Sequence, residues 1–241
     1  MSDRIAVVTG SNRGLGLHLV EQLQRRGWQV VAACRRPATA DALASLHTQA
    51  IIELDTSDSE SIRRFGVDIA ARAGRIDLLI NNAGVMMPSA RPVDALPDDN
   101  GAANGPLAAL EADAMLEVIR VNSIGPLLVA QSVESLLGTG SVVLNISSRL
   151  GSIGVGAADE YAYAMSKAAL NMATTILARE LAPTGVIVVA ASPGWVRTDM
   201  GGGAAMLTAD QSTSALVELV DRLGPGDSGT FVGHTGEPIP W

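Results

Sequence analysis

Short apolar runs alternate with longer amphipathic stretches along most of this chain. Several runs are apolar at successive positions, which is typical of parallel strands that helices cover on both faces. The predicted strands are Ile5–Thr9, Gln29–Cys34, Ala50–Leu54, Ile76–Asn81, Ser141–Ser147, Val186–Ala191 and the short Thr230–Gly233. The predicted helices are Gly14–Arg26, Asp41–His47, Ser59–Arg72, Leu107–Leu137, Tyr161–Leu181 and Thr208–Leu223.

This regular alternation predicts an α/β fold class, with a Rossmann-like, doubly wound parallel sheet of about seven strands. No internal repeat and no linker divides the sequence, so we expect a single domain over residues 1–241. Two stretches lack the periodicity. Val85–Pro106 is rich in proline and is expected to be a functional loop or a mobile surface insertion. Pro193–Leu207, which contains Gly201–Gly203, is expected to form a flexible flap.

The composition fits one soluble domain and excludes several classes of protein. Of the 241 residues, 47% are hydrophobic, which is enough for a substantial core. The net charge of −8 argues against a nucleic-acid-binding protein, because neutralising phosphates needs a basic surface. Cys34 is the only cysteine, so an intrachain disulfide is excluded and a cytoplasmic location is expected. No apolar run is long enough to cross a bilayer, so no membrane partner is expected.

A glycine-rich loop separates the first strand from the first helix, where dinucleotide-binding folds hold a pyrophosphate. Gly10 permits the turn, Gly14 lets the backbone approach the phosphates, and Gly16 lets helix and strand pack closely. N–H groups at the start of the helix then face the phosphates. A tight turn with a purely structural purpose is the alternative. The loop residues expected to bind the cofactor are Gly10, Asn12, Arg13, Gly14, Leu15 and Gly16.

The end of the second strand indicates which dinucleotide is bound. Proteins that prefer NAD tend to place an acid here against the ribose 2′-hydroxyl, but this strand ends with Cys34 and Arg35. Arg35 can form a charge-assisted contact with a 2′-phosphate, and Arg13 can add a second positive charge, so NADP is predicted. We interpret Cys34 as a small buried hydrophobe rather than as a reactive thiol.

Polar residues also follow the third and fourth strands, at the edge of the sheet where α/β proteins bind ligands. Asp55, followed by Thr56, can accept a hydrogen bond from the adenine amino group, or it is a helix cap or turn acid. The sequence Asn81-Asn82-Ala83-Gly84 ends the fourth strand, and a simple turn is again the alternative. Asn82, Ala83 and Gly84 are expected to contact the cofactor.

Tyr163 and Lys167 are the candidate acid–base pair. Their i,i+4 spacing in a helical stretch puts them on one face, one turn apart. A cation beside a phenol lowers its pKa, so Tyr163 can act as an acid in reduction and as a base in oxidation. Tyr161 is the weaker candidate, because its i+4 neighbour is Met165. Taken alone, the pair is equally consistent with a surface phenol and amine.

Two further polar groups add to the candidate site. Ser147 and Ser148 end the fifth strand, where a hydroxyl can stabilise developing alkoxide charge on a substrate oxygen or can merely cap a turn. Asn122 lies in an otherwise apolar helical region, where it can bind a water or a backbone carbonyl. The sequence has neither the nucleophile elbow of hydrolases nor the phosphate loop of NTPases, and its three histidines are isolated. Hydrolase, NTPase and metalloenzyme functions are therefore not expected.

Over essentially the whole sequence, the ordered motifs resemble the short-chain dehydrogenase/reductase family. The tail from Ser192 to Trp241 looks like the sniffer-type and C-factor-type carbonyl-reductase branch. The motifs are Thr9-Gly10-x-x-x-Gly14-x-Gly16, Asn81-Asn82-Ala83-Gly84, Asn122, Ser148, Tyr163-x-x-x-Lys167 and Pro193-Gly194.

The resemblance implies a catalytic tetrad and a cofactor, NADP(H), which supplies the hydride as NADPH. In the tetrad, Ser148 would orient the carbonyl and Tyr163 would donate the proton. Lys167 would hold the nicotinamide ribose and tune Tyr163, and Asn122 would support a water relay. The segment that holds the nicotinamide in this family matches Pro193, Gly194, Val196 and Thr198.

The expected function is the NADPH-dependent reduction of a ketone or aldehyde to an alcohol. The expected substrate pocket includes part of the Val85–Pro106 loop, and its other residues are Leu150, Ile153, Trp195 and Met200. The stretch between Ser148 and Tyr163 looks slightly longer than in common members of the family. The alternative is an NADP(H)-binding sensor with little turnover, against which a complete tetrad counts. The helix Ala162–Leu181 can pack against its copy in a dimer or tetramer, and a monomer is the other possibility.

Overall fold

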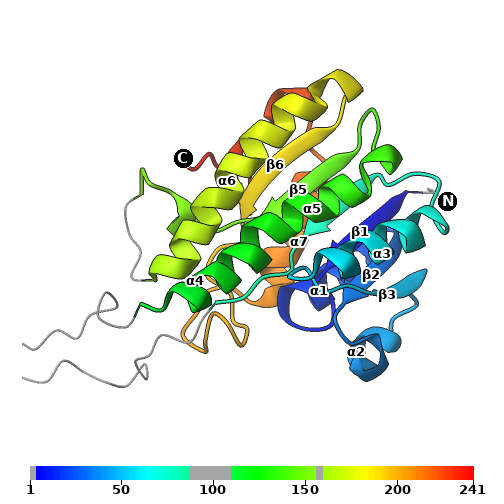
Figure 1. Ribbon diagram of the computed structural model, residues 1–241, viewed down its shortest axis with the longest axis horizontal. Helices are drawn as coiled ribbons and strands as arrows, with labels where there is room; N and C mark the ends of the chain where they lie inside the picture. The colour runs from blue at the N-terminus through cyan, green and yellow to red at the C-terminus, as the bar shows by residue number, and fades with distance from the viewer. Residues whose placement is uncertain (1–3, 87–109, 156–159) are drawn as a thin grey trace, which may run out of the picture.

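A computed structural model describes residues 4–86, 110–155 and 160–241 of the chain. They form a single α/β domain in which a seven-stranded, all-parallel sheet lies between two layers of helices (Figure 1). The strand order is β3-β2-β1-β4-β5-β6-β7, which confirms the predicted doubly wound sheet. The strands are β1 Ile5–Thr9, β2 Gln29–Cys34, β3 Ala50–Glu53, β4 Leu78–Asn81, β5 Val142–Ile146, β6 Ile187–Ser192 and β7 Phe231–Gly233.

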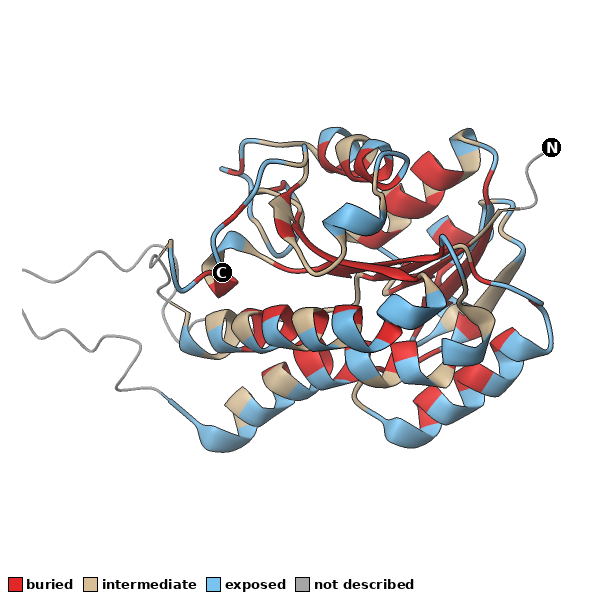
Figure 2. Cartoon of the chain, turned by 90° about the horizontal axis from the view of Figure 1, so that it is seen from above, coloured by how far each residue is buried: buried red, intermediate tan, exposed pale blue. Residues whose placement is uncertain are grey.

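The helices cover both faces of the sheet because alternate strand residues point to opposite sides. In β1, Ala6 and Val8 belong to one core cluster and Val7 to the other. Figure 2 shows the buried residues gathered on the strands and on the inward faces of the helices. The helices are α1 Gly14–Arg25, α2 Asp41–Ala44, α3 Ser59–Ala70, α4 Ala112–Ile119, α5 Gly125–Ser132, α6 Tyr161–Leu181 and α7 Ala209–Val220.

One predicted element has a different internal structure. The stretch Leu107–Leu137 was expected to be one helix, but in its described part a π-helical turn, Arg120–Ile124, joins α4 to α5. Pro126 has no N–H to donate to the carbonyl four residues earlier, so the α-helical hydrogen-bond ladder is broken at that point. A short 3₁₀ turn, Glu134–Leu136, then follows α5. Single π turns inside helices are frequent at functional sites, and this one carries Asn122.

The structure describes only the start of the first irregular stretch but all of the second. The predicted loop Val85–Pro106 lies, apart from Val85 and Met86, outside the described residues. In the predicted flap Pro193–Leu207, two backbone hydrogen bonds join the start of the segment to its end. Arg197 N–H donates to the Leu207 carbonyl, and Leu207 N–H donates to the Trp195 carbonyl. The expected mobility of the flap stays a prediction.

Two expectations about partners concern a membrane and a second copy of the chain. No helix in residues 4–86, 110–155 or 160–241 is long and apolar enough to cross a membrane. The expected self-association helix is α6, which leaves Met165, Met172 and Ile176 exposed. One chain is described, so the oligomeric state stays a prediction.

Candidate active site

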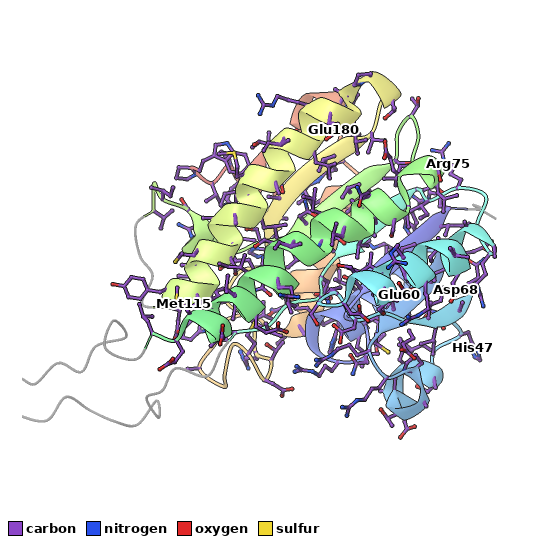
Figure 3. The ribbon with its side chains drawn as sticks, in the orientation of Figure 1. His47, Glu60, Asp68, Arg75, Met115 and Glu180 are labelled. Atoms are coloured by element: carbon purple, nitrogen blue, oxygen red, sulfur yellow. The ribbon has the colours of Figure 1, made fainter. Side chains whose placement is uncertain are left out.

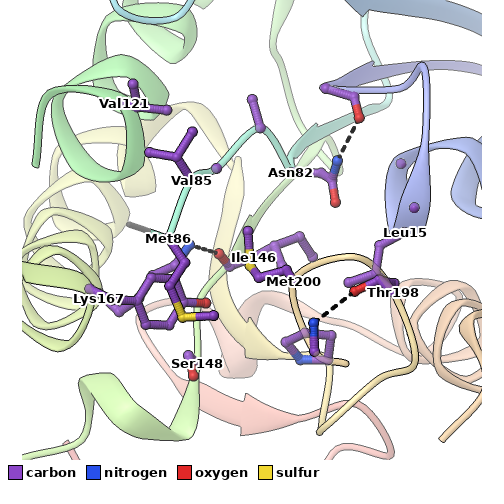
Figure 4. Close-up of a pocket in the computed structure, with 18 of the residues that line it drawn as sticks. Leu15, Asn82, Val85, Met86, Val121, Ile146, Ser148, Lys167, Thr198 and Met200 are labelled. Atoms are coloured by element: carbon purple, nitrogen blue, oxygen red, sulfur yellow. Dashed lines mark hydrogen bonds between the residues drawn. The ribbon is translucent and has the colours of Figure 1, made fainter. Parts of the chain in front are cut away.

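A cavity of about 820 Å³ opens at the carboxyl ends of the parallel strands (Figure 4). It is bounded by the segments that follow β1 to β6, together with α4 and α6. Residues far apart in the sequence meet there, as expected for a parallel sheet. All the predicted cofactor residues line it: Gly10, Asn12, Arg13, Gly14, Leu15, Gly16, Arg35, Asp55, Thr56, Asn82, Ala83, Gly84, Tyr163, Lys167, Pro193, Gly194, Val196 and Thr198.

The glycine loop has the shape of a phosphate cradle. Gly10 has φ of +65°, and a Cβ there would lie 2.8 Å from the Cα of Ala83. A Cβ on Gly16 would overlap the carbonyl oxygen of Gly10, so α1 reaches the loop only because this residue is glycine. At Gly14 the nearest atom to an added Cβ is 3.8 Å away, on Thr198, which leaves the backbone open to the cavity. Helix α1 begins without a side-chain cap, so its first N–H groups are free to bind an anion.

The segment after β4 is tied to the glycine loop by several hydrogen bonds. The side-chain amide of Asn82 donates to the carbonyls of Thr9, at 2.9 Å, and of Gly10, at 3.1 Å. The hydroxyl oxygen of Thr9 accepts from the backbone N–H groups of Asn82 and Ala83, at 3.1 and 3.0 Å. These bonds hold two walls of the cavity together, so Asn82 has a structural purpose as well as a position on the cavity wall.

The outer end of the cavity carries two arginines in different situations. Arg35 is exposed, lines the cavity, and makes no ion pair with any acid of the described chain. Arg13, in contrast, donates to the carboxylate of Asp199 in the flap at 2.9 Å. Arg13 therefore forms an ion pair with Asp199, which the sequence alone did not predict.

Two other residues at this end match the structural interpretations given above. Cys34 is buried in β2, and this burial raises the pKa of its thiol, as expected for a small apolar residue. Cys34 nevertheless also lines the cavity. Asp55 accepts hydrogen bonds from the backbone N–H and hydroxyl of Ser57, at 2.9 and 2.7 Å, so it forms a turn while lining the cavity.

At the inner end, Tyr163, Lys167 and Ser148 come together from α6 and the end of β5. The ammonium of Lys167 lies 5.6 Å from the centre of the Tyr163 ring and donates to the carbonyl of Ile146 at 2.7 Å. Figure 4 shows this bond, with Ser148 on the same side of the cavity. The Ser148 side chain is close enough to the phenol of Tyr163 to lower the pKa of that phenol. Three of the four tetrad residues therefore lie together at the inner end of the cavity.

Burial dominates the proton affinities at this end. It raises the pKa of Tyr163, and the hydrogen bond with Ser148 lowers that pKa in part. Burial also lowers the pKa of Lys167 to about 8, since its ammonium is buried beside a neutral carbonyl. Burial and the Ser148 side chain account for this change in the pKa of Tyr163, and the expected lowering by Lys167 stays a prediction.

Asn122, the fourth tetrad residue, does not line the cavity. Its side chain is fully buried, and its amide oxygen accepts from the Val85 N–H at 2.8 Å. Its amide nitrogen donates to the Val85 carbonyl at 2.8 Å and to the Ser166 hydroxyl at 3.0 Å. The side chain therefore joins the segment after β4 to α6, and its support of a water relay stays a prediction.

The structure brings three of the four predicted substrate residues to the cavity. Leu150, Trp195 and Met200 line it, whereas Ile153 is 84% exposed and lies outside the lining. Ile153 follows the turn after Ser148 and points to solvent, which the sequence spacing did not reveal.

A stripe on α4 and on the π-helical turn that follows it was missed by the sequence analysis. Ala114, Glu117, Val118 and Val121 line the cavity at helical spacing, and this periodicity was the signal that could have identified them. Val85 and Met86, from the loop predicted to contribute to the substrate pocket, also line the cavity. Other lining residues that were not predicted are Leu54, Ile146, Ser147, Arg149, Ser192 and Gly201.

The three histidines lie in separate parts of the fold. His47 is exposed beyond α2 (Figure 3), and a ring nitrogen of His18 is hydrogen-bonded to the Gly14 carbonyl at 2.9 Å. His234 lies behind Gly194, 3.5 Å from where a Cβ would be. Among the described residues, no group of His, Cys, Asp and Glu has the geometry of a metal site.

Comparisons with known proteins agree with this geometry. The short chain dehydrogenase family model matches residues 4–206. The C-signal protein of Myxococcus xanthus is 35% identical over 186 residues, which is 75% of this chain and all of that protein. The carbonyl reductase Sniffer of D. melanogaster and the NADPH-bound carbonyl reductase from chicken fatty liver each superpose with a TM-score of 0.85. They are 32% and 30% identical to this chain, and the matches cover all of both chains.

Proposed function

The chain belongs to the short-chain dehydrogenase family, and we propose that it catalyses the NADPH-dependent reduction of a ketone or aldehyde to an alcohol. One observation carries the proposal. The Tyr163 phenol lies beside Ser148 and Lys167, inside a cavity whose other end is a glycine cradle. The similarity to two carbonyl reductases supports the same reaction.

The cofactor fits the residues present. Gly14, open to the cavity at the uncapped start of α1, would receive the pyrophosphate, and Lys167 would hold the nicotinamide ribose. When bound, NADPH supplies the hydride. The flap residues Val196 and Thr198 lie on the cavity wall and would contact the nicotinamide.

The chain's own residues supply the proton and stabilise the charge that develops on oxygen. Tyr163 donates its phenolic proton to the substrate carbonyl oxygen as that oxygen becomes an alkoxide. The hydroxyl of Ser148 donates a hydrogen bond to the same oxygen. Because the raised pKa keeps the Tyr163 phenol protonated at neutral pH, it is in the form that reduction requires.

Lys167 changes charge within the working range of pH. With a pKa of about 8, it is mainly an ammonium at neutral pH. One of its three N–H groups is held by the Ile146 carbonyl, which fixes its direction and leaves two to donate to the ribose hydroxyls. Loss of this charge above pH 8 weakens that contact, so cofactor binding is expected to decline there.

The preference for NADPH rests on Arg35. Its guanidinium has no acidic partner in the described chain, and a 2′-phosphate at the end of β2 would give it one. In the chicken enzyme the bound cofactor is NADPH, which supports the same choice.

The test is NADPH consumption over a panel of aldehydes, quinones and cyclic ketones. We expect turnover with at least one of these carbonyl compounds and a much lower rate with NADH. Saturable NADPH binding without turnover across the panel would instead favour a sensor. Absence of NADPH binding would contradict both functions.

A further inference from the structure

Helix α6 is held against β5 by a row of buried polar contacts. Counted along the strand, Asn145 donates to the Thr174 hydroxyl at 2.9 Å, and Ile146 accepts from Lys167 at 2.7 Å. Ser147 then donates to the amide oxygen of Asn171 at 2.6 Å. Each contact fixes one residue at the end of β5 or directly after it against one turn of α6, so the row sets how the helix lies along the strand.

Asn171 differs from the other members of this row because it holds the chain on both sides of Ser148. Its amide oxygen accepts from the Ser147 hydroxyl, and its amide nitrogen donates to the Gly151 carbonyl at 3.3 Å. Both partners are buried, as is Asn171 itself at 3% exposure. Among the described residues, no other side chain bonds both flanks of Ser148.

The backbone after Ser148 also lies directly on α6. A Cβ added to Gly151 would come within 2.6 Å of the Cβ of Lys167. The turn that carries Ser148 therefore rests on the helix that carries Tyr163 and Lys167. Asn171 is on the same helix face, one turn beyond Lys167.

We propose that Asn171 is a positioning residue, which holds the Ser148 hydroxyl at the distance from Tyr163 that proton transfer to the substrate oxygen requires. The proposal rests on the function given above. Asn171 does not reach the cavity and acts only through the segment Ser147–Gly151. An amide suits this task because it carries an acceptor for Ser147 and a donor for Gly151 in one planar group.

A double-mutant cycle tests this proposal. We expect Asn171→Ala to lower kcat by roughly ten- to a hundredfold, since small misplacements of reacting groups have effects of this size. The dissociation constant of NADPH is expected to be unchanged. In a Ser148→Ala background, the same substitution is expected to change kcat by less than about twofold, because its effect passes through Ser148. Equal losses in both backgrounds would overturn the proposal.

The proton affinity of Tyr163 gives a second readout that needs no turnover. The sequence has two tyrosines, so in a Tyr161→Phe background only Tyr163 contributes phenolate absorbance during a pH titration. Since the Ser148 hydrogen bond lowers the pKa of Tyr163, loosening Ser148 is expected to raise that pKa. An unchanged titration in Asn171→Ala would contradict the proposal, even if no carbonyl substrate were found.

Two variants separate positioning from a loss of stability. Thr174→Val removes an equally buried hydrogen bond from α6 to β5, but three residues before Ser148. It is expected to lower the melting temperature as Asn171→Ala does while keeping kcat within about twofold of the wild type. If Asn171→Ala does not fold, Ser147→Ala removes the other partner of the same hydrogen bond. We expect Ser147→Ala to lower kcat in the wild-type background but to change it by less than about twofold in the Ser148→Ala background. Equal losses of kcat in Thr174→Val and Asn171→Ala, at equal stability, would mean a structural role only.

Discussion

The two ends of the cavity use charge in opposite ways. At the inner end, Tyr163 and Lys167 are enclosed by protein, and burial determines their proton affinities. At the outer end, Arg13, Arg35 and Asp199 are exposed to water, where ion pairs are weak. Inner residues are therefore expected to affect the chemical step strongly, whereas outer ones adjust which cofactor binds and how tightly.

The largest effect is expected from removing the proton donor. Tyr163→Phe keeps the ring but loses the transferable proton, so turnover is expected to fall by at least about a hundredfold. NADPH affinity, measured by fluorescence titration, should stay near the wild-type value. A variant that keeps more than about a tenth of the wild-type kcat would show that Tyr163 is not the principal acid.

A smaller effect is expected from Arg35→Ala at the outer end. A charge-assisted contact contributes roughly 1.5–3 kcal/mol, so NADPH should bind about ten- to a hundredfold more weakly. NADH binding should hardly change. Comparing kcat/KM for both cofactors with one carbonyl substrate measures this preference.

Arg36→Ala is the matched control, because Arg36 is also exposed but does not line the cavity. In Cys34→Asp/Arg35→Ile, a new carboxylate should shift the preference further, toward NADH. Equal weakening of both cofactors by Arg35→Ala would mean that Arg35 does not contact the 2′-phosphate.

The buried ammonium of Lys167 should be visible in stability as well as in activity. Its pKa is about 8 in the folded protein and near the usual 10.5 in the unfolded chain. Between these values the unfolded chain binds a proton that the folded protein has lost, so the free energy of unfolding rises with pH. The gain is roughly 1 kcal/mol per pH unit above 8.

Urea denaturation of wild type and Lys167→Met at pH 7.5 and 9.5 measures this gain by difference. The Lys167→Met variant is expected to be inactive. Its free energy of unfolding is expected to lack the rise with pH that the wild type shows. Parallel pH dependences would show that the ammonium of Lys167 is solvated, contrary to its burial in this structure.

The smallest effect is expected from Asp199→Asn. It releases Arg13 from an exposed ion pair, and such pairs contribute at most about 1 kcal/mol. NADPH affinity should therefore rise by about two- to threefold, with no change for NADH. The two dissociation constants measured at low and high salt provide the test, since the gain should shrink as salt screens the phosphate. Weaker binding of both cofactors would mean that Asp199 instead holds the flap in place.

The sequence predicted well those features that depend on local chemistry. The strands were found because most of their residues are apolar at successive positions, and the glycine loop because Gly10 and Gly16 meet steric demands that no other residue satisfies. The spacing of Tyr163 and Lys167 was also sufficient to place them on one helix face.

Features that depend on tertiary contacts could not be predicted in this way. One partner of Asn122 is Val85, which lies 37 positions away, and nothing local indicates it. Asn171 resembles any polar residue in a helix until Ser147 is placed against it. The pKa of Lys167 depends on how much protein surrounds its ammonium, which only the assembled fold determines.

The order of the strands also has a consequence for how the protein folds. Strand β1 lies inside the sheet and pairs with β2 on one side and with β4 on the other, so the sheet is assembled through contacts between distant parts of the chain. The cavity lining runs from Gly10 to Gly201, and no single fragment of the chain contains it. Cofactor binding thus requires an almost complete sheet. At a hundredfold excess over its dissociation constant, NADPH should stabilise the whole domain by about 2.7 kcal/mol, and its binding can serve as a probe of the last step of folding.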